Sequence, residues 1–93
     1  HVADLTELNQ DERNEIFELS AHAMKTLRKV SAPAGFNLGM NQGAISGAGV
    51  AEHIHQHIVP RWSGDVNFMP IIGQTKVLPV LLAQTRAELA QAW

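Results

Sequence analysis

Three histidines occupy every second position in the stretch His53-Ile54-His55-Gln56-His57-Ile58-Val59-Pro60. Read as a β-strand that ends at Pro60, this stretch directs His53, His55 and His57 to one face and the intervening residues to the other. Imidazole titrates near neutral pH, so such a row can supply a nucleophile, a proton donor or acceptor, or metal ligands. A purely structural role suits one buried histidine but not three, because burying three polar rings is costly.

Length and composition limit the classes of protein that the chain can represent. Its 93 residues suffice for one small domain, and the net charge of −2 with scattered Lys and Arg argues against a nucleic-acid partner. No cysteine is present, which fits a reducing compartment, and we expect a cytoplasmic protein. No apolar run approaches the ~20 residues of a membrane span, and no signal peptide is recognisable. Because the first residue is His1 rather than Met, we expect a processed chain or a fragment.

Local patterns before the histidines predict a helical turn and a long helix. Asp4 can cap a single turn near the start. Asn9 and Glu12 have the spacing of a capping box, which predicts an amphipathic helix of about twenty residues ending before Pro33. Its apolar stripe, at steps of three and four residues, comprises Ile16, Leu19, Ala23, Leu27 and Val30. We expect His22, on this helix, to be partly exposed and without function.

A strand and a second helix are predicted on either side of the histidine row. Residues 36–41 alternate, with Phe36, Leu38 and Met40 toward the core, and should pair antiparallel with the histidine strand. The loop 42–49 is rich in small residues and could bring backbone N–H groups to an anion, or simply join the strands. The C-terminal helix is expected from about residue 78 to 93, with one stripe formed by Leu81, Leu82, Thr85, Leu89 and Trp93.

Spacing alone supports two functions for the histidines equally. They could ligate a metal ion on a metal-binding strand, with Glu52 or Asp65 completing the site. Alternatively, one imidazole could attack an electrophile while a hydrogen bond to its other nitrogen fixes the tautomer. The residue pattern by itself leaves both interpretations open.

The order of these segments resembles the histidine-triad (HIT) superfamily of nucleotide hydrolases and transferases, whose motif is His-x-His-x-His followed by two apolar residues. Residues 35–43 look like the Asn-containing strand that precedes the triad in this family. After the triad, Pro60-Arg61-Trp62 and residues 64–69 look most like the bacterial branch related to diadenosine tetraphosphate phosphorylases. The resemblance implies an α+β fold: a HIT-like antiparallel sheet with a long central helix and a C-terminal helix. It also implies that the family's N-terminal strands are missing, so that residues 1–93 form a single partial HIT domain.

The resemblance implies an enzyme that acts on the α-phosphate of dinucleoside polyphosphates or related nucleotides. His55 would be the nucleophile and would form a nucleotidyl-histidine intermediate. His57 would contact the phosphate or assist the leaving group, His53 would support them, and a strand carbonyl would hold the second ring nitrogen of His55. No cofactor or metal is implied for the chemistry, although a divalent cation can accompany the substrate. A fragment of this length could lack activity by itself.

The family pattern places phosphate contacts before the triad, with two departures. The implied contacts come from Asn41 and from the backbone of Gly47, Ala48 and Gly49. Many members have Gln and Ser or Thr in this loop, where this chain has Ala48, Gly49 and Val50. Gln56 also stands where many members have an apolar residue. These differences leave hydrolysis, phosphorolysis and the phosphoramidate hydrolase activity of the same superfamily as alternatives.

Several other residues admit a functional and a structural interpretation. Arg61 and Lys76 could be cations of the acceptor site, but surface charges are the simpler interpretation. Trp62, Phe68 and Trp93 could stack on a base, whereas packing or a dimer contact is favoured. The resemblance implies a homodimer, and no membrane partner is expected.

Overall fold

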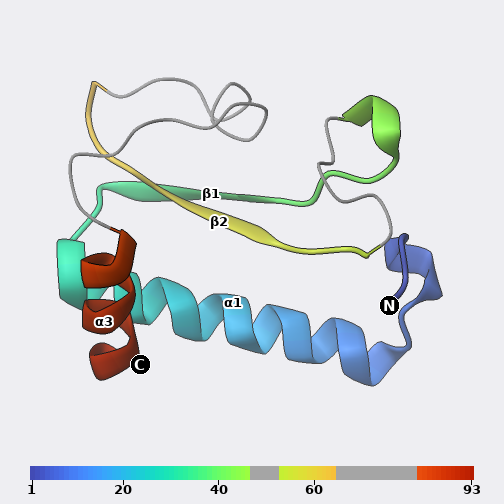
Figure 1. Cartoon of the computed structure of the whole chain (residues 1–93), viewed down its shortest axis with the longest axis horizontal. Helices are drawn as coiled ribbons and strands as arrows, with labels where there is room; N and C mark the ends of the chain where they lie inside the picture. Colours follow the sequence, from blue (N-terminus) through green and yellow to red (C-terminus); the bar gives the residue numbers. More distant parts are fainter. Residues whose placement is uncertain (47–52, 65–81) are drawn as a thin grey trace.

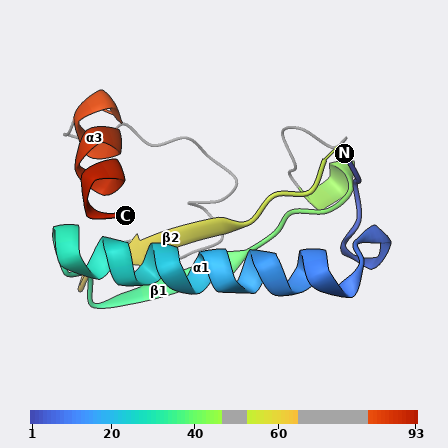
Figure 2. The same ribbon diagram turned by 90° about the horizontal axis from the view of Figure 1, so that it is seen from below.

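The computed structural model describes residues 1–46, 53–64 and 82–93. Along these ranges the elements are η1 (Leu5–Glu7), α1 (Gln10–Ser31), β1 (Gly35–Gly39), η2 (Ala44–Ser46), β2 (His57–Arg61) and α3 (Leu82–Ala92). Helix α1 runs along one face of the pair of strands, and α3 stands beside its C-terminal part, far from the N-terminus (Figures 1 and 2). This arrangement confirms the α+β class.

The two helical segments near the start begin where the sequence predicts. The Asn9 side chain accepts the Glu12 N–H at 2.8 Å, and the Glu12 carboxylate accepts the Asn9 N–H at 2.9 Å, which completes the capping box of α1. In η1, the Asp4 carboxylate accepts the hydroxyl and the N–H of Thr6 at 2.6 and 2.9 Å. These two bonds stabilise the ionised form and lower the pKa of Asp4. Helix α1 ends at Ser31, and the capping residue Ala32 that follows has a left-handed φ of 45°.

Strands β1 and β2 pair antiparallel, from Gly35 opposite Arg61 to Gly39 opposite His57. Residues directly opposite each other share a face, so Leu38 and Ile58 lie on one side and Gly39 and His57 on the other. The first side packs toward α1: Ile58 lines a hollow of about 260 Å³ with helix residues including Ile16 and Ala23. The predicted pairing and the helix-facing side of β1 are thereby confirmed.

The extent of the histidine strand differs from the prediction at both ends. β2 begins at His57, so His53 and His55 precede it, and it continues through Pro60 to Arg61. It begins late because its partner β1 stops at Gly39, which leaves no ladder for the earlier residues. Pro60 is tolerated because it must occupy a non-hydrogen-bonded pair with Phe36, where its missing N–H would point away from β1.

No hydrophobic side chain is fully buried within the described ranges. The buried residues there are Ser20 and Thr26, whose hydroxyls donate to the carbonyls of Ile16 and His22, one turn earlier in α1. The predicted core positions are only partly covered, since Leu19 is 50% and Leu38 39% exposed to solvent. The described elements therefore form a thin layer rather than an enclosed core.

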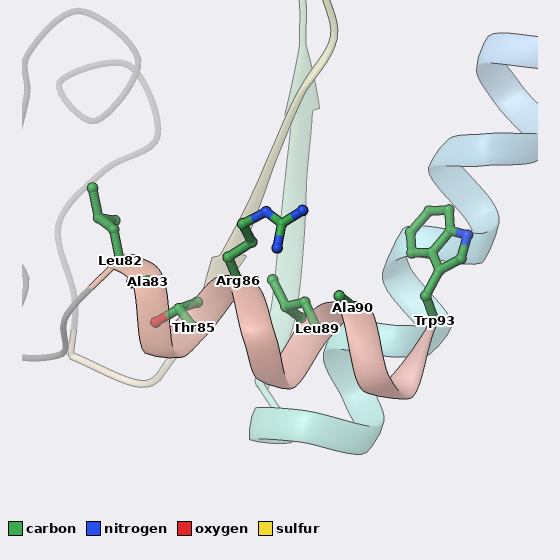
Figure 3. A pocket seen from close by; sticks show the side chains of 7 residues that line it. All are labelled: Leu82, Ala83, Thr85, Arg86, Leu89, Ala90 and Trp93. Atoms are coloured by element: carbon green, nitrogen blue, oxygen red, sulfur yellow. The ribbon is translucent and has the colours of Figure 1, made fainter.

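Helix α3 confirms the C-terminal helix within the described residues, whereas 78–81 lie outside them. Leu82, Arg86, Leu89 and Trp93 project from one side of the helix (Figure 3). Together with neighbouring residues they line an open groove of about 850 Å³. The predicted stripe is thus a real face of the helix, but Leu82 remains 75% exposed.

The capping box of α1 provides a test of this helix assignment. Replacing Asn9 with Ala should lower the free energy of unfolding by about 1 kcal/mol, because the Glu12 N–H in the first turn loses its side-chain acceptor. Urea denaturation followed by circular dichroism would measure the change. Asn9→Asp keeps the acceptor and serves as the control, and equal losses in both variants would contradict the assigned role.

Candidate active site

The three triad histidines form a continuous row of rings, although only one of them lies in a strand. The ring centroids of His53 and His55 are 5.6 Å apart, and those of His55 and His57 are 4.9 Å apart. Both pairs meet edge to face, and all three residues are half-buried. His1 extends the row, with its ring 5.5 Å from that of His53. The prediction that the three imidazoles gather together is confirmed.

A main-chain oxygen orients the central ring. The carbonyl oxygen of His53 lies 3.3 Å from Nδ1 of His55, at the long end of the hydrogen-bond range. Because a carbonyl can only accept, this contact assigns the proton to Nδ1 and the lone pair to Nε2. The tautomer with an available Nε2 lone pair is the one that a nucleophilic histidine requires.

The surroundings of His57 favour its neutral form. Partial burial is the larger cause that lowers the pKa of His57 from its ordinary value of 6.5, and the neighbouring His55 charge lowers it further. Gly39, directly opposite on β1, places no side chain over the ring. At pH 7 a neutral His57 can donate one hydrogen bond while its other nitrogen accepts.

The sheet face that carries His57 also carries a polar pair. Arg61 donates from its guanidinium to Oδ1 of Asn37, a residue paired with Val59 on the same face. This bond ties Arg61, for which an acceptor-site role and a surface charge were both considered, to the sheet. Arg61 is half-buried rather than a fully exposed surface charge.

The segment before β2 is held by the start of the chain, which sequence reasoning missed. The N–H of Ile54 donates to the carbonyl of Val2 at 2.7 Å. The N–H of Leu5 donates in turn to the side-chain oxygen of Gln42 at 2.6 Å. Neither Val2 nor Gln42 carries a local signal of this role, because both bonds join residues far apart in the sequence.

The predicted phosphate-binding residues are only partly described. Asn41 is half-buried and follows the end of β1, at the end of the ladder where the triad segment enters β2. The other predicted contacts, Gly47, Ala48 and Gly49, lie outside the described residues. So do the remaining residues weighed for a metal site, an acceptor site or base stacking: Glu52, Asp65, Phe68 and Lys76.

His22 and Trp93 form a contact away from the triad. Nε2 of His22 lies 3.1 Å from the main-chain oxygen of Trp93, and their rings meet edge to face at 4.1 Å. His22 is half-buried, as expected for a partly exposed histidine, and this contact joins α3 to α1. Trp93 therefore packs against the long helix. Trp62, by contrast, is 46% exposed to solvent.

The described part of the chain contains neither a metal-binding cluster nor a helix that could span a membrane. Within residues 1–46, 53–64 and 82–93, no three His, Cys, Asp or Glu side chains are grouped so as to hold a metal ion. In the same part of the chain, neither α1 nor α3 is long and apolar enough to cross a membrane.

Comparison with known proteins establishes the family. The family model of the HIT domain matches residues 1–64. The chain is 46% identical over 92 residues to the AP-4-A phosphorylase of Mycobacterium tuberculosis, in strains CDC 1551 / Oshkosh and ATCC 25618 / H37Rv. That match covers 99% of this chain and 47% of the relative. An uncharacterized HIT-like protein of Mycoplasma genitalium is 32% identical over 68 residues, covering 73% of this chain and 48% of that protein.

A solved structure agrees with this relationship. The Zn-bound histidine triad family protein from Mycobacterium smegmatis superimposes with a TM-score of 0.70 at 26% identity, covering 98% of this chain and 63% of that chain. The chain therefore belongs to the HIT domain family, as the sequence resemblance implied. It spans about half the length of the curated relatives that it matches.

The lowered pKa of His57 can be tested by an NMR titration. NMR should give this ring a pKa below 6.5, and His55→Ala should raise that pKa only partway, because burial is the larger cause. Between the lowered pKa and 6.5, the unfolded chain binds more protons at this ring than the folded chain. The contribution of His57 to stability should therefore decrease as the pH falls through this window. A His57 pKa of 6.5 or higher would contradict the assignment.

Proposed function

We propose that this chain carries the catalytic segment of an enzyme that transfers a nucleotidyl group from a dinucleoside polyphosphate through His55. The observation that carries the proposal is the contact between Nδ1 of His55 and the His53 carbonyl, which leaves the lone pair on Nε2. Membership of the HIT family and the likeness to proteins named AP-4-A phosphorylase support the choice of substrate.

The proposed reaction proceeds in two displacements. In the first, Nε2 of His55 attacks the α-phosphorus, and the bond from that phosphorus to the bridging oxygen breaks. The departing nucleoside polyphosphate takes the bond electrons, while the nucleotide remains on Nε2. In the second, an oxygen of phosphate or water attacks, and the phosphorus–nitrogen bond breaks to restore the imidazole. Phosphate as acceptor gives a nucleoside diphosphate, whereas water gives a monophosphate and releases a proton.

The neighbouring groups fit supporting roles in this scheme. A neutral His57, adjacent in the row, can donate a hydrogen bond to a phosphate oxygen or to the leaving oxygen. His53 contributes the carbonyl that orients His55. Asn41, with the backbone of Gly47, Ala48 and Gly49, is proposed to bind the phosphates. No cofactor is needed for these steps, and a divalent cation can bind together with the substrate.

Phosphorolysis is the acceptor reaction that we favour. The name of the Mycobacterium tuberculosis relatives supports it, as does a half-buried Arg61 on the face that bears His57. Hydrolysis of the same substrates, or of nucleoside phosphoramidates, would use the same nucleophile with a different acceptor or leaving group. The groups that bind the acceptor and the leaving group, rather than the orientation of His55, would distinguish these reactions.

We also propose that the enzyme works as a homodimer. The exposed apolar groove along α3, lined by Leu82, Leu89 and Trp93, supports a contact between protein surfaces (Figure 3). A cytoplasmic location stays a prediction of the composition alone.

A labelling experiment tests the nucleophile. The chain is incubated with dinucleoside tetraphosphate labelled at the α-phosphate, with and without phosphate and with chelator, and separated without acid because phosphoramidates are acid-labile. We expect a labelled protein that resists chelation, and a nucleoside diphosphate only when phosphate is added. His55→Ala should remove the label and lower turnover by about 10³-fold or more, while nucleotide binding stays measurable.

A matched histidine serves as the control for this substitution. His22→Ala removes an imidazole that contacts Trp93 and lies outside the triad, so labelling should persist. Full labelling of His55→Ala would refute the proposed nucleophile. Activity lost on chelation and regained with zinc would instead support the metal-binding interpretation of the triad.

A further inference from the structure

The peptide unit between His53 and Ile54 is held at both of its polar groups. Its carbonyl oxygen faces Nδ1 of His55 at 3.3 Å, and its N–H donates to the carbonyl of Val2 at 2.7 Å. A peptide unit is planar, so the direction of its N–H fixes the direction of its oxygen. The bond to Val2 therefore determines where the group that orients His55 points.

The hydrogen bond from Ile54 to Val2 is important because the β ladder does not hold the backbone around His53 and Ile54. The β ladder ends at Gly39 opposite His57, and residues 53–56 belong to no strand. Within the described residues, the hydrogen bond from Ile54 to Val2 joins that stretch to another segment of backbone. Donation from the N–H also polarises the carbonyl of the same unit, which strengthens it as an acceptor for His55.

Gln42 fixes the segment that supplies the Val2 carbonyl. Its side-chain oxygen accepts the N–H of Leu5 at 2.6 Å, across 37 positions of the sequence. Leu5 is the first residue of η1, and the cap of that turn, Asp4, is held by two bonds from Thr6. The short run from Val2 to Leu5 is thus anchored at one end to Gln42 and at the other to Ile54.

We propose that Gln42 is a positioning residue for the nucleophile. It holds the start of the chain so that the Val2 carbonyl aligns the His53–Ile54 peptide, which in turn keeps the Nε2 lone pair of His55 directed for attack. In this scheme Gln42 acts through its bond to Leu5 rather than through contact with the triad rings or the substrate. The catalytic part of the inference rests on the proposed function, whereas the orientation of His55 can be measured without it.

The two partners of the Gln42 bond can be altered separately. Gln42→Ala removes the acceptor, while Gln42→Glu keeps an oxygen at the same position. Leu5→Pro removes the donor, and proline is tolerated at the first position of a helical turn. The preceding Asp4 already has the extended backbone that proline requires, with φ −134° and ψ 139°. Leu5→Ala keeps the N–H and controls for the lost side chain.

The first measurement is the tautomer of His55, read from its ring ¹⁵N shifts in the full chain without substrate. We expect the Nδ1-protonated form to dominate in the wild type, Gln42→Glu and Leu5→Ala. It should lose that dominance in Gln42→Ala and Leu5→Pro. Circular dichroism verifies that each variant folds. If Gln42→Ala does not fold, the comparison of Leu5→Pro with Leu5→Ala tests the proposal instead. An unchanged tautomer in a folded Gln42→Ala or Leu5→Pro variant would overturn the proposal.

The second measurement is the kinetics of nucleotide transfer. Gln42→Ala should lower kcat by about 10-fold and change KM by less than about 2-fold, because orientation rather than binding is impaired. Gln42→Glu should restore most of kcat, and Gln42→Ala combined with Leu5→Pro should cost no more than either alone. An equal loss in Gln84→Ala, on the exposed face of α3, would refute a specific role. If Gln42→Ala shifts the His55 tautomer but the unaltered chain transfers no nucleotide, the proposed function would be refuted. The positioning role of Gln42 would still stand.

Discussion

The end of the β1–β2 ladder at the Gly39–His57 pair determines how the candidate site is built. His57 lies in the ladder, whose main-chain bonds hold its backbone. His53 and His55 lie beyond it, and a backbone without a ladder needs other partners for its polar groups. The structure supplies one partner from the start of the chain and uses the freed carbonyl of His53 to orient His55. The β ladder therefore holds the backbone of His57, whereas the bond to Val2 holds the backbone beside His53 and His55.

The division of the sheet into two faces separates packing from chemistry. Helix α1 packs against the face that carries Leu38 and Ile58, and its small residues Ser20 and Ala23 line the space between helix and strand. The guanidinium carbon of Arg28 lies 5.2 Å from the centre of the Phe36 ring on the same side. The opposite face carries His57, with Gly39 across from it, and the bonded pair of Arg61 and Asn37. Polar groups, among them the proposed site residue His57, thus gather on the side that the long helix does not cover.

How much of this could be predicted depended on the range of the interactions involved. The capping box at Asn9 and Glu12 joins residues three positions apart, and the alternation of Phe36 and Leu38 reflects strand geometry, so both were readable locally. The period of two also placed the histidine rings together. The start of β2 was misplaced because it depends on where β1 stops, and strand alternation continues without regard to the partner. Gln42 was overlooked because its bond to Leu5 depends on the folded path of the chain.

Pro60 has a consequence for how this sheet can grow. Because its main-chain groups face away from β1, the outer edge of β2 offers a carbonyl at Pro60 but no N–H to match it. A further strand along that edge, from this chain or from another, could bond both the N–H and the carbonyl of Ile58. At Pro60 it could bond only the carbonyl, so one hydrogen bond would be lost there. Extended backbone pairing with a second molecule is thereby discouraged beside the triad. Association through side chains, as along the apolar face of α3, carries no such penalty.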